Sequence, residues 1–160
     1  MKKIIVLLAV ALIGVSSLSA QTTVEGQKVH KTSNKFGAMG GHIGYAFLGP
    51  TVGLHGDFCA NNFRGRAGFD VFIDKAVCLG FDLGFHYLIN LVDGLNIYPI
   101  IGASIGFGNM DFHLGLDLGA GIEYNFRNGW GIFADGKYNV GFIVFDAAPY
   151  RSYIGVTKRF

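Results

Sequence analysis

The sequence predicts an all-β fold: an eight-stranded antiparallel up-and-down transmembrane β-barrel that follows an N-terminal signal peptide. From Phe112 to Phe126, every even-numbered residue is apolar and every odd-numbered residue is polar or glycine, which is the two-residue period of a strand. The mean hydropathy is +0.39, yet no apolar run of helix-spanning length occurs beyond the N-terminus. Hydrophobicity that is spread as alternation is what a membrane-spanning barrel needs.

The N-terminal residues have the composition of a secretory leader. Two lysines precede an apolar stretch, and a patch of small residues follows it, with the cut expected after Ala20. The next segment is polar and has no periodicity, so we expect a flexible periplasmic tail. The expected domains are a signal peptide over 1–20, the tail over 21–35 and the barrel over 36–160.

Eight alternating segments follow the tail, separated by turn signals such as Asp93-Gly94 and Asn128-Gly129. An even number of strands lets an antiparallel sheet close with both termini in the periplasm. Proline cannot donate to a strand ladder, so we expect a bulge or strand break at Pro99. The expected strands are Phe36–Phe47, Thr51–Ala60, Arg64–Ile73, Val77–Asn90, Leu95–Phe107, Phe112–Phe126, Trp130–Val144 and Tyr150–Phe160.

The alternation alone leaves open which face points outward. A soluble lipocalin-like barrel would turn the apolar face inward, whereas a membrane barrel turns it to lipid. The leader, the strand lengths and the terminal Phe160 favour the membrane barrel. Interfacial aromatic side chains are then expected near the periplasmic rim at Tyr87, Tyr124 and Trp130, and near the outer rim at Tyr150.

The polar face would line a narrow lumen that holds nearly equal numbers of acids and bases. Unpaired charge is costly there, so we expect a network of ion pairs and hydrogen bonds that fills the lumen. A gated proton or ion path is the sharper alternative. The predicted lumen network comprises His42, His55, Asp57, Arg64, Arg66, Asp70, Asp82, His86, His113, Asp117, Glu123, Asp135, Lys137, Arg151 and Arg159.

Metal and disulfide chemistry are both conceivable on the inward face. The four inward histidines lack the close spacing of a metal motif, so we expect them to be hydrogen-bonded, and we expect no metal or cofactor. An oxidising periplasm would permit a disulfide between Cys59 and Cys78. The predicted topology places them at opposite ends of the barrel, so we expect two buried thiols instead.

Several segments resemble a known family. The leader ends in SSLSAQ, the last strand is YIGVTKRF, and GFDV, GFDL and GLDL recur at 68–71, 80–83 and 115–118. These features are similar to small outer-membrane β-barrels of the OmpX and OmpA-barrel type, within the broad "porin family". The resemblance implies a Gram-negative outer membrane and contact with its lipid and lipopolysaccharide. It also implies insertion by the barrel-assembly machinery, which would read Ile154, Val156 and Phe160.

The expected function is a membrane-structural or surface-interaction role without enzymatic activity. The alternative is a narrow porin for ions or small solutes, and the third candidate is a barrel enzyme that modifies lipid A. The sequence has no phosphate-binding glycine loop, and Ser104 and His113 lie on different strands without an evident third partner. A net charge of +2 argues against nucleic acid. The expected outer loops are too short to form a large receptor surface, which argues against adhesion through protruding loops. The sequence identifies no surface partner.

Overall fold

The computed structural model describes residues 35–47, 49–73, 77–108, 111–143 and 148–160. The predicted signal peptide and nearly all of the predicted tail lie outside the described residues. No helix in the described part of the chain is long and apolar enough to cross a membrane.

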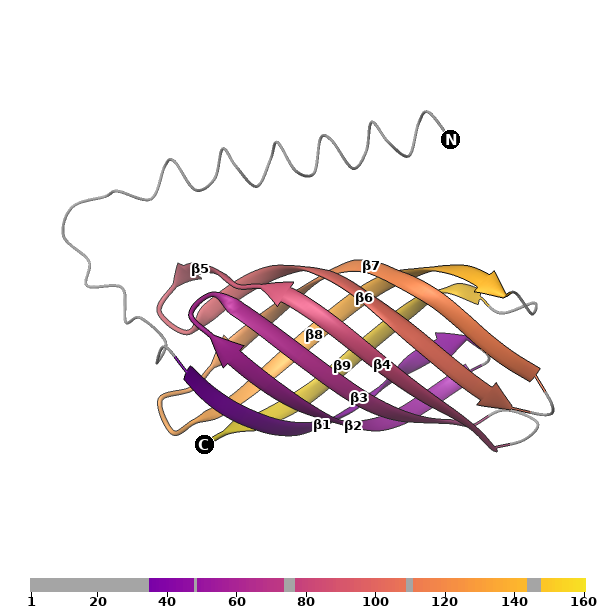
Figure 1. Ribbon diagram of the computed structural model, residues 1–160. Coiled ribbons are helices and arrows are strands. Elements are labelled where there is room, and N and C mark those ends of the chain that lie inside the picture. Colours follow the sequence, from indigo (N-terminus) through magenta and orange to yellow (C-terminus); the bar gives the residue numbers. More distant parts are fainter. Residues whose placement is uncertain (1–34, 48, 74–76, 109–110, 144–147) are drawn as a thin grey trace, which may run out of the picture.

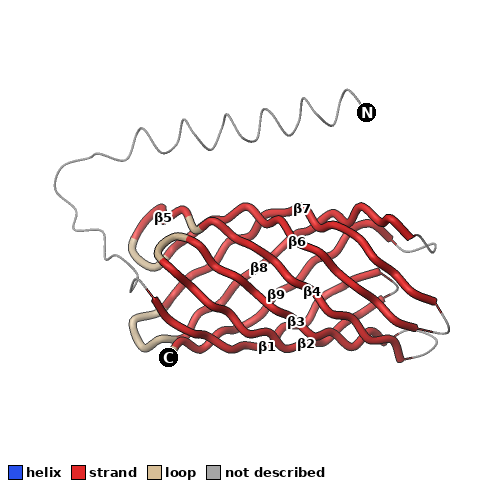
Figure 2. The backbone as a smooth tube through the Cα atoms, in the orientation of Figure 1, coloured by secondary structure: helices blue, strands red, loops and turns tan. Residues whose placement is uncertain are grey.

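The described chain forms one antiparallel sheet that closes on itself (Figures 1 and 2). Apart from β4 and β5, strands that follow each other along the chain pair with each other, β1 pairs with β9, and β4 pairs with β6 to complete the ring. The strands are β1 (Lys35–Phe47), β2 (Gly49–Ala60), β3 (Phe63–Ile73), β4 (Val77–Tyr87), β5 (Ile89–Val92), β6 (Leu95–Gly108), β7 (Asp111–Asn125), β8 (Trp130–Ile143) and β9 (Ala148–Arg159). Eight of these strands close the barrel, which confirms the predicted up-and-down architecture.

One predicted strand is wrong in its extent. The segment Val77–Asn90 was expected to be a single strand, but β4 ends at Tyr87 and the four-residue β5 begins at Ile89. Leu88 leaves the ladder between them: its amide donates to the carbonyl of Asn62, and its side chain is buried in the lumen. β5 then pairs only with β6, so it extends the barrel wall at one end.

The prediction of a bulge or break at Pro99 is also wrong, because β6, the strand that contains this residue, has neither. β6 runs through Pro99, which lies opposite Ala120 of β7 with no shift of register. On its other edge, β6 pairs with β4 up to Ile100 and with β5 from Ile97, so Pro99 lies where this neighbour is interrupted. The missing N–H of proline is tolerated because the break occurs in the adjacent strand.

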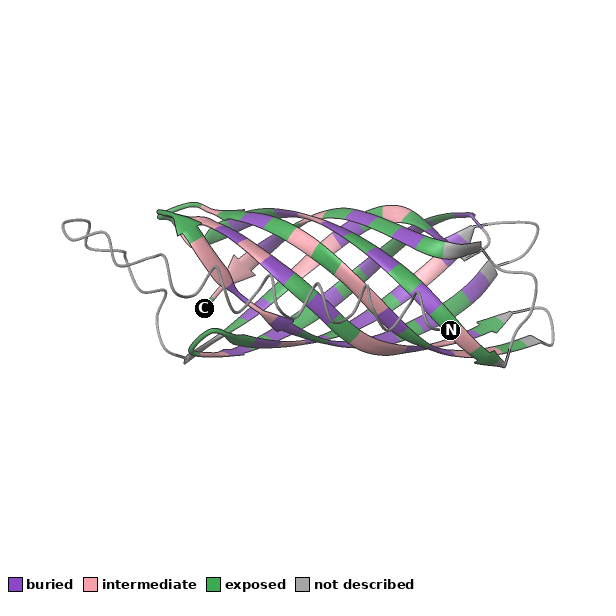
Figure 3. Ribbon diagram, turned by 90° about the horizontal axis from the view of Figure 1, so that it is seen from above, coloured by how far each residue is buried: buried purple, intermediate pink, exposed green. Residues whose placement is uncertain are grey.

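The two faces of the sheet differ as a membrane barrel requires. Buried and exposed residues alternate along the strands, and β2 does so almost without exception (Figure 3). Charged and amide side chains point into the lumen, and large apolar side chains such as Leu54, Phe85 and Ile154 are more than half exposed on the outside. Such an outer surface would be poorly solvated by water and suits hydrocarbon.

The barrel has two distinct ends. The terminal end carries the start of β1, the C-terminus and the turns at 61–62, 93–94 and 126–129, and it lies on the left in Figure 1. The far end is where β1, β3, β6 and β8 finish. Outward aromatic side chains lie at both ends: Tyr87, Tyr124 and Trp130 at the terminal end, and Tyr150 at the far end, opposite Tyr138. Trp130 also lies beside Lys158, whose ammonium is 5.3 Å from the indole ring centre.

The single tryptophan of the chain can test whether this surface faces lipid. Trp130 is 47% exposed at the start of β8. In refolded protein, we expect lipids brominated near the ester carbonyl to quench its fluorescence more strongly than lipids brominated at mid-chain, because the residue lies near one rim. Stronger quenching by aqueous acrylamide than by either lipid would contradict a membrane-embedded outer face.

Both cysteines are buried, and they do not form a disulfide, as predicted. Cys59 is opposite Arg64 beside the β2–β3 turn at the terminal end, and Cys78 is opposite Phe72 at the start of β4, at the far end. The length of the barrel therefore separates the two sulfur atoms.

This separation predicts the thiol reactivity of the protein. Without reductant, a maleimide should leave both cysteines of the folded barrel unmodified, because neither sulfur is accessible. After denaturation, still without reductant, both should react, as read by intact mass. Cysteines that remained unmodified in the denatured chain would reveal a disulfide and an incorrect strand register.

Candidate functional site

The lumen is the candidate site, and its side chains form groups that follow one another along the barrel. At the terminal end, the Glu123 carboxylate is the centre of one group. It pairs with the guanidinium of Arg64 on β3, and Asn96 and Asn125 donate to its Oε1 atom at 2.9 and 2.8 Å. Arg159 on the last strand adds a contact at 3.4 Å. Four strands are thereby joined at one carboxylate.

The next group spans the full width of the barrel. Arg66 donates from Nε to the Oδ1 atom of Asp57 at 2.7 Å and from the second arm to Oδ2 at 2.8 Å, which is a bidentate pair. Its remaining nitrogen reaches Asp135 on β8, four positions around the ring from β3, at 3.2 Å. Tyr98 donates to the other oxygen of Asp135 at 2.5 Å. The guanidinium also lies 4.4 Å from the Phe133 ring centre.

Two histidines lie beside this group. His42 and His55 have stacked rings with their Nδ1 atoms 3.3 Å apart, and His42 Nε2 is 2.6 Å from Asp70. Tyr153 on β9 donates to the second oxygen of Asp70 at 3.2 Å. Nearby, Lys137 on β8 donates to Asp82 on β4 at 3.2 Å. The contacts to Asp70 and Asp82 again join strands that are not neighbours in the sheet.

Asp117 organises the group that lies toward the far end. It pairs with Arg151, accepts a hydrogen bond from the Asn139 amide at 2.6 Å, and lies 3.5 Å from the Ser104 hydroxyl. Asn139 also contacts His113 through its Oδ1 atom, at 2.8 Å from His113 Nε2. His113 is half-buried, so it marks the more open edge of this group.

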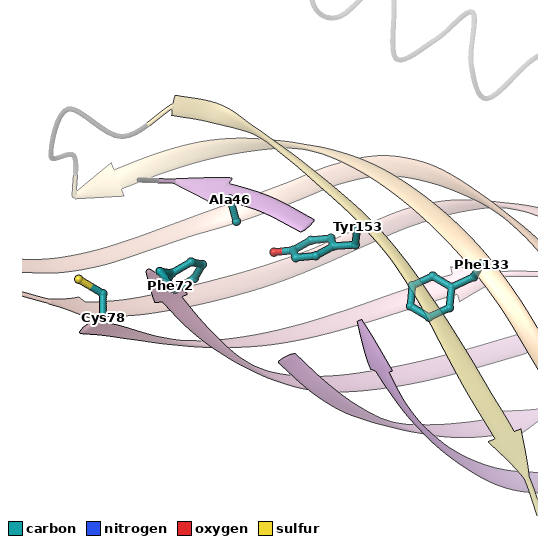
Figure 4. Close-up of a cluster of buried hydrophobic side chains, with 5 residues drawn as sticks. All are labelled: Ala46, Phe72, Cys78, Phe133 and Tyr153. Carbon is teal, nitrogen blue, oxygen red and sulfur yellow. The ribbon is translucent and has the colours of Figure 1, made fainter. Parts of the chain in front are cut away.

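Apolar side chains add to the lumen filling. Ala46, Phe72 and Cys78 are buried at the far end, and Tyr153 and Phe133 extend the cluster toward the middle of the barrel (Figure 4). A smaller cluster of Leu88, Tyr98 and Ile100 lies toward the terminal end. Because the Leu88 side chain enters the lumen where β4 stops, the irregular strand end contributes to this filling.

Little space remains between these groups. One internal cavity lies among His42, Arg66, Asp82 and Lys137, with about 10 Å³ open to the centre of a water molecule. That volume holds about one water molecule.

Inward glycines make room for the charged groups. A Cβ atom at Gly53 would collide with the Asp70 carboxylate and the His42 ring, and one at Gly68 would collide with the Asp82 carboxylate. Both glycines are directly opposite inward residues of a neighbouring strand. The large charged side chains therefore occupy the space that the glycines on the neighbouring strands leave free.

Every side chain of the predicted network lies on the inner face. Thirteen are fully buried, and His113 and Arg159 are half-buried. The four histidines do not converge: among the described residues, no three histidine, cysteine or acidic side chains are placed to hold a metal ion. Six other side chains belong to the network although the predicted set did not include them, and each shares the strand phase of an inward charged or polar residue: Asn96, Tyr98, Ser104, Asn125, Asn139 and Tyr153.

Comparisons with known proteins identify the fold. The N-terminal β-barrel domain of Pseudomonas aeruginosa OprF matches with a TM-score of 0.67 and 15% identity, over 79% of this chain and 98% of that one. Neisserial surface protein A matches with a TM-score of 0.52 and 14% identity, over 80% and 98%. A de novo designed transmembrane β-barrel matches with a TM-score of 0.58 and 10% identity, over 81% and 99%.

No family model matches the sequence, and no curated protein matches it at a significant level. At these identities the structural matches define the architecture and leave the activity open. The chain has the fold of the small eight-stranded outer-membrane barrels, the OmpA and OmpX type.

The network predicts a large difference between buried and exposed ion pairs. Arg64→Ala should destabilise the barrel by about 3–5 kcal/mol, because it leaves the buried Glu123 carboxylate short of its main partner. The matched control is Arg127→Ala, whose partner Asp93 lies 3.6 Å away on the exposed surface. That change should cost about 0–1 kcal/mol. Urea unfolding in lipid vesicles gives both values, and equal costs would contradict a stabilising lumen network.

Proposed function

We propose that this protein is an integral outer-membrane barrel with a membrane-structural or surface-interaction role, and that its lumen does not conduct. The observation that supports this most directly is the set of ion pairs that cross the lumen, above all Arg66 between Asp57 and Asp135. A hydrated pore would need these side chains to withdraw to the wall. Doing so would break buried charge pairs, at a cost of several kcal/mol for each pair.

The outer membrane is the location that the fold and the apolar outer face favour. We place the terminal end in the periplasm. An even number of antiparallel strands brings the start of β1 and the end of β9 to one side of the membrane, as in outer-membrane barrels whose two termini are periplasmic. The far end then faces outward, and its connections are short: residues 48, 74–76, 109–110 and 144–147. Any surface partner would meet this end of the barrel, where the longest connection in the sequence is 144–147.

A lipid-modifying enzyme is the weaker candidate. Ser104, the inward serine, donates to Asp117 and accepts from Asn139, and it is 1% exposed. An acyl nucleophile must meet the substrate ester, which for a membrane lipid lies outside the barrel wall. We therefore propose a non-enzymatic protein that needs no cofactor.

Single-channel recording tests the proposed closed lumen. Refolded protein in a planar bilayer should give no resolved openings, and quenching of Trp130 by brominated lipid in the same preparation would show that the barrel had inserted. Asp117→Ala and Arg151→Ala remove lumen charges, and Arg127→Ala is the exposed control. Steady wild-type openings that the two lumen variants alter and the control does not would establish a narrow porin instead.

A further inference from the structure

One acid of the described lumen differs from the others in its partner. The Asp70 carboxylate lies 2.6 Å from His42 Nε2 and accepts a hydrogen bond from the Tyr153 hydroxyl at 3.2 Å. Each of the other inward acids forms an ion pair with a lysine or an arginine: Asp57, Asp82, Asp117, Glu123 and Asp135. Any positive charge beside Asp70 must therefore come from His42.

The charges of the described lumen are unequal unless a histidine is protonated. The six acids named above face five inward lysine and arginine side chains, which are Arg64, Arg66, Lys137, Arg151 and Arg159. Uncompensated charge is costly in such an interior. One added proton would make the two sets equal, and it would be most favourable beside Asp70.

The contact between His42 and His55 determines where that proton can lie. An ionised carboxylate only accepts hydrogen bonds, so His42 Nε2 donates to Asp70. The Nδ1 atoms of the two rings are 3.3 Å apart, so one hydrogen lies between them. If His42 Nδ1 carries it, His42 is an imidazolium and His55 is neutral, with its own hydrogen on Nε2. If His55 Nδ1 carries it, both rings are neutral.

The surroundings of the pair favour one added proton over two. Four acids and three bases face the two rings, and a second proton would place two imidazolium rings in contact. The charged and titratable groups that face the pair are Asp57 on β2, Arg64, Arg66 and Asp70 on β3, Asp82 on β4, Asp135 and Lys137 on β8, and Tyr153 on β9.

The backbone leaves the space that the two rings occupy. Gly53 lies directly opposite both His42 and Asp70, and a Cβ atom there would collide with both side chains. Gly40 lies directly opposite His55, and a Cβ atom there would be 2.6 Å from the Nε2 atom of that ring. The two histidines are therefore held in fixed positions, with their Nδ1 atoms facing each other.

We infer that His42 and His55 together form a buried site for one proton, which makes His42 the cation of Asp70 and leaves His55 neutral. Uptake moves two hydrogens: hydronium gives a proton to His55 Nε2 and becomes water, and the hydrogen on His55 Nδ1 passes to His42 Nδ1. Two N–H bonds form and one breaks. The internal cavity of about 10 Å³ is lined by both rings and has room for the water that exchanges this proton. The site lies inside the barrel, so the inference does not depend on the proposed function.

Nitrogen NMR of the histidine rings tests the number of protons. The full chain is labelled with ¹⁵N-histidine, refolded into lipid nanodiscs and measured at pH 7. We expect His42 to be protonated at both nitrogens, His55 to be protonated at Nε2 alone, and a scalar coupling to join the two Nδ1 atoms. His86 is the internal control and should be neutral, because its Nδ1 accepts from Arg64 Nε at 2.9 Å. Two neutral rings in the His42 and His55 pair would overturn the inference.

An alkaline titration of the same sample tests whether the two rings act as one site. Loss of the His42 charge should occur together with the move of the His55 hydrogen from Nε2 to Nδ1, with one midpoint for both rings. Separate midpoints, or a His55 ring that keeps its hydrogen on Nε2, would contradict a shared proton.

Asp70→Asn tests the role of the carboxylate. The change keeps the size of the side chain and removes its charge, so His42 should become neutral at pH 7. Asp117→Asn is the matched control, because it makes the same change in the group that contains Arg151, and His42 should stay charged. Loss of the His42 charge in both variants, or in neither, would overturn the assignment to Asp70. The heat-dependent gel shift verifies folding, and the wild-type spectra decide the proton count if a variant does not fold.

Discussion

Charged side chains inside this barrel find their partners among the other side chains of the lumen, because the closed sheet separates most of them from bulk water. Each acid of the lumen contacts a base, a histidine or a hydrogen-bond donor from another strand. A lone buried charge would cost several kcal/mol, so the strand register, the inward glycines and the interior hydrogen bonds must all fit together. The strength of this interior also explains how the outer face can consist almost wholly of apolar groups.

The architecture could be predicted from the sequence because a membrane barrel imposes a strict period. In Phe112–Phe126 the alternation has no exception, and the inward phase of each strand could be identified from a residue such as His42, Asp57 or Asp82. The same phase contained Tyr98 and Tyr153, but tyrosine is equally common on the lipid side. The structure adds their partners, because the Asp135 and Asp70 carboxylates lie beside the two hydroxyls.

The partners within the lumen could not be predicted. Arg66 and Asp135 are 69 residues apart, and they meet because their strands lie on opposite walls at one height. That height depends on the tilt and stagger of the whole barrel, which no local pattern encodes. The break at Leu88 was missed for a related reason. The alternation continues through Tyr87 and Ile89, whereas the chain changes its pairing partner there.

The structural neighbours share the fold at 10–15% identity. A natural domain, a surface protein and a designed barrel thus share one architecture although their sequences differ widely from this one. What distinguishes this protein must lie in its own side chains. In the described residues the most distinctive set is the network of paired charges in the lumen.

The distribution of paired charges along the chain affects how the barrel assembles. Arg64 and Arg66 lie in the first half of the chain that forms the barrel, and their partners Glu123 and Asp135 lie in the second half. In a third pair the acid, Asp82, lies in the first half and the base, Lys137, lies in the second. A half-formed sheet would therefore carry several uncompensated charges on the surface that becomes the lumen. Water must remain there until the last strands arrive, so dehydration of the interior and closure of the ring become a single late event.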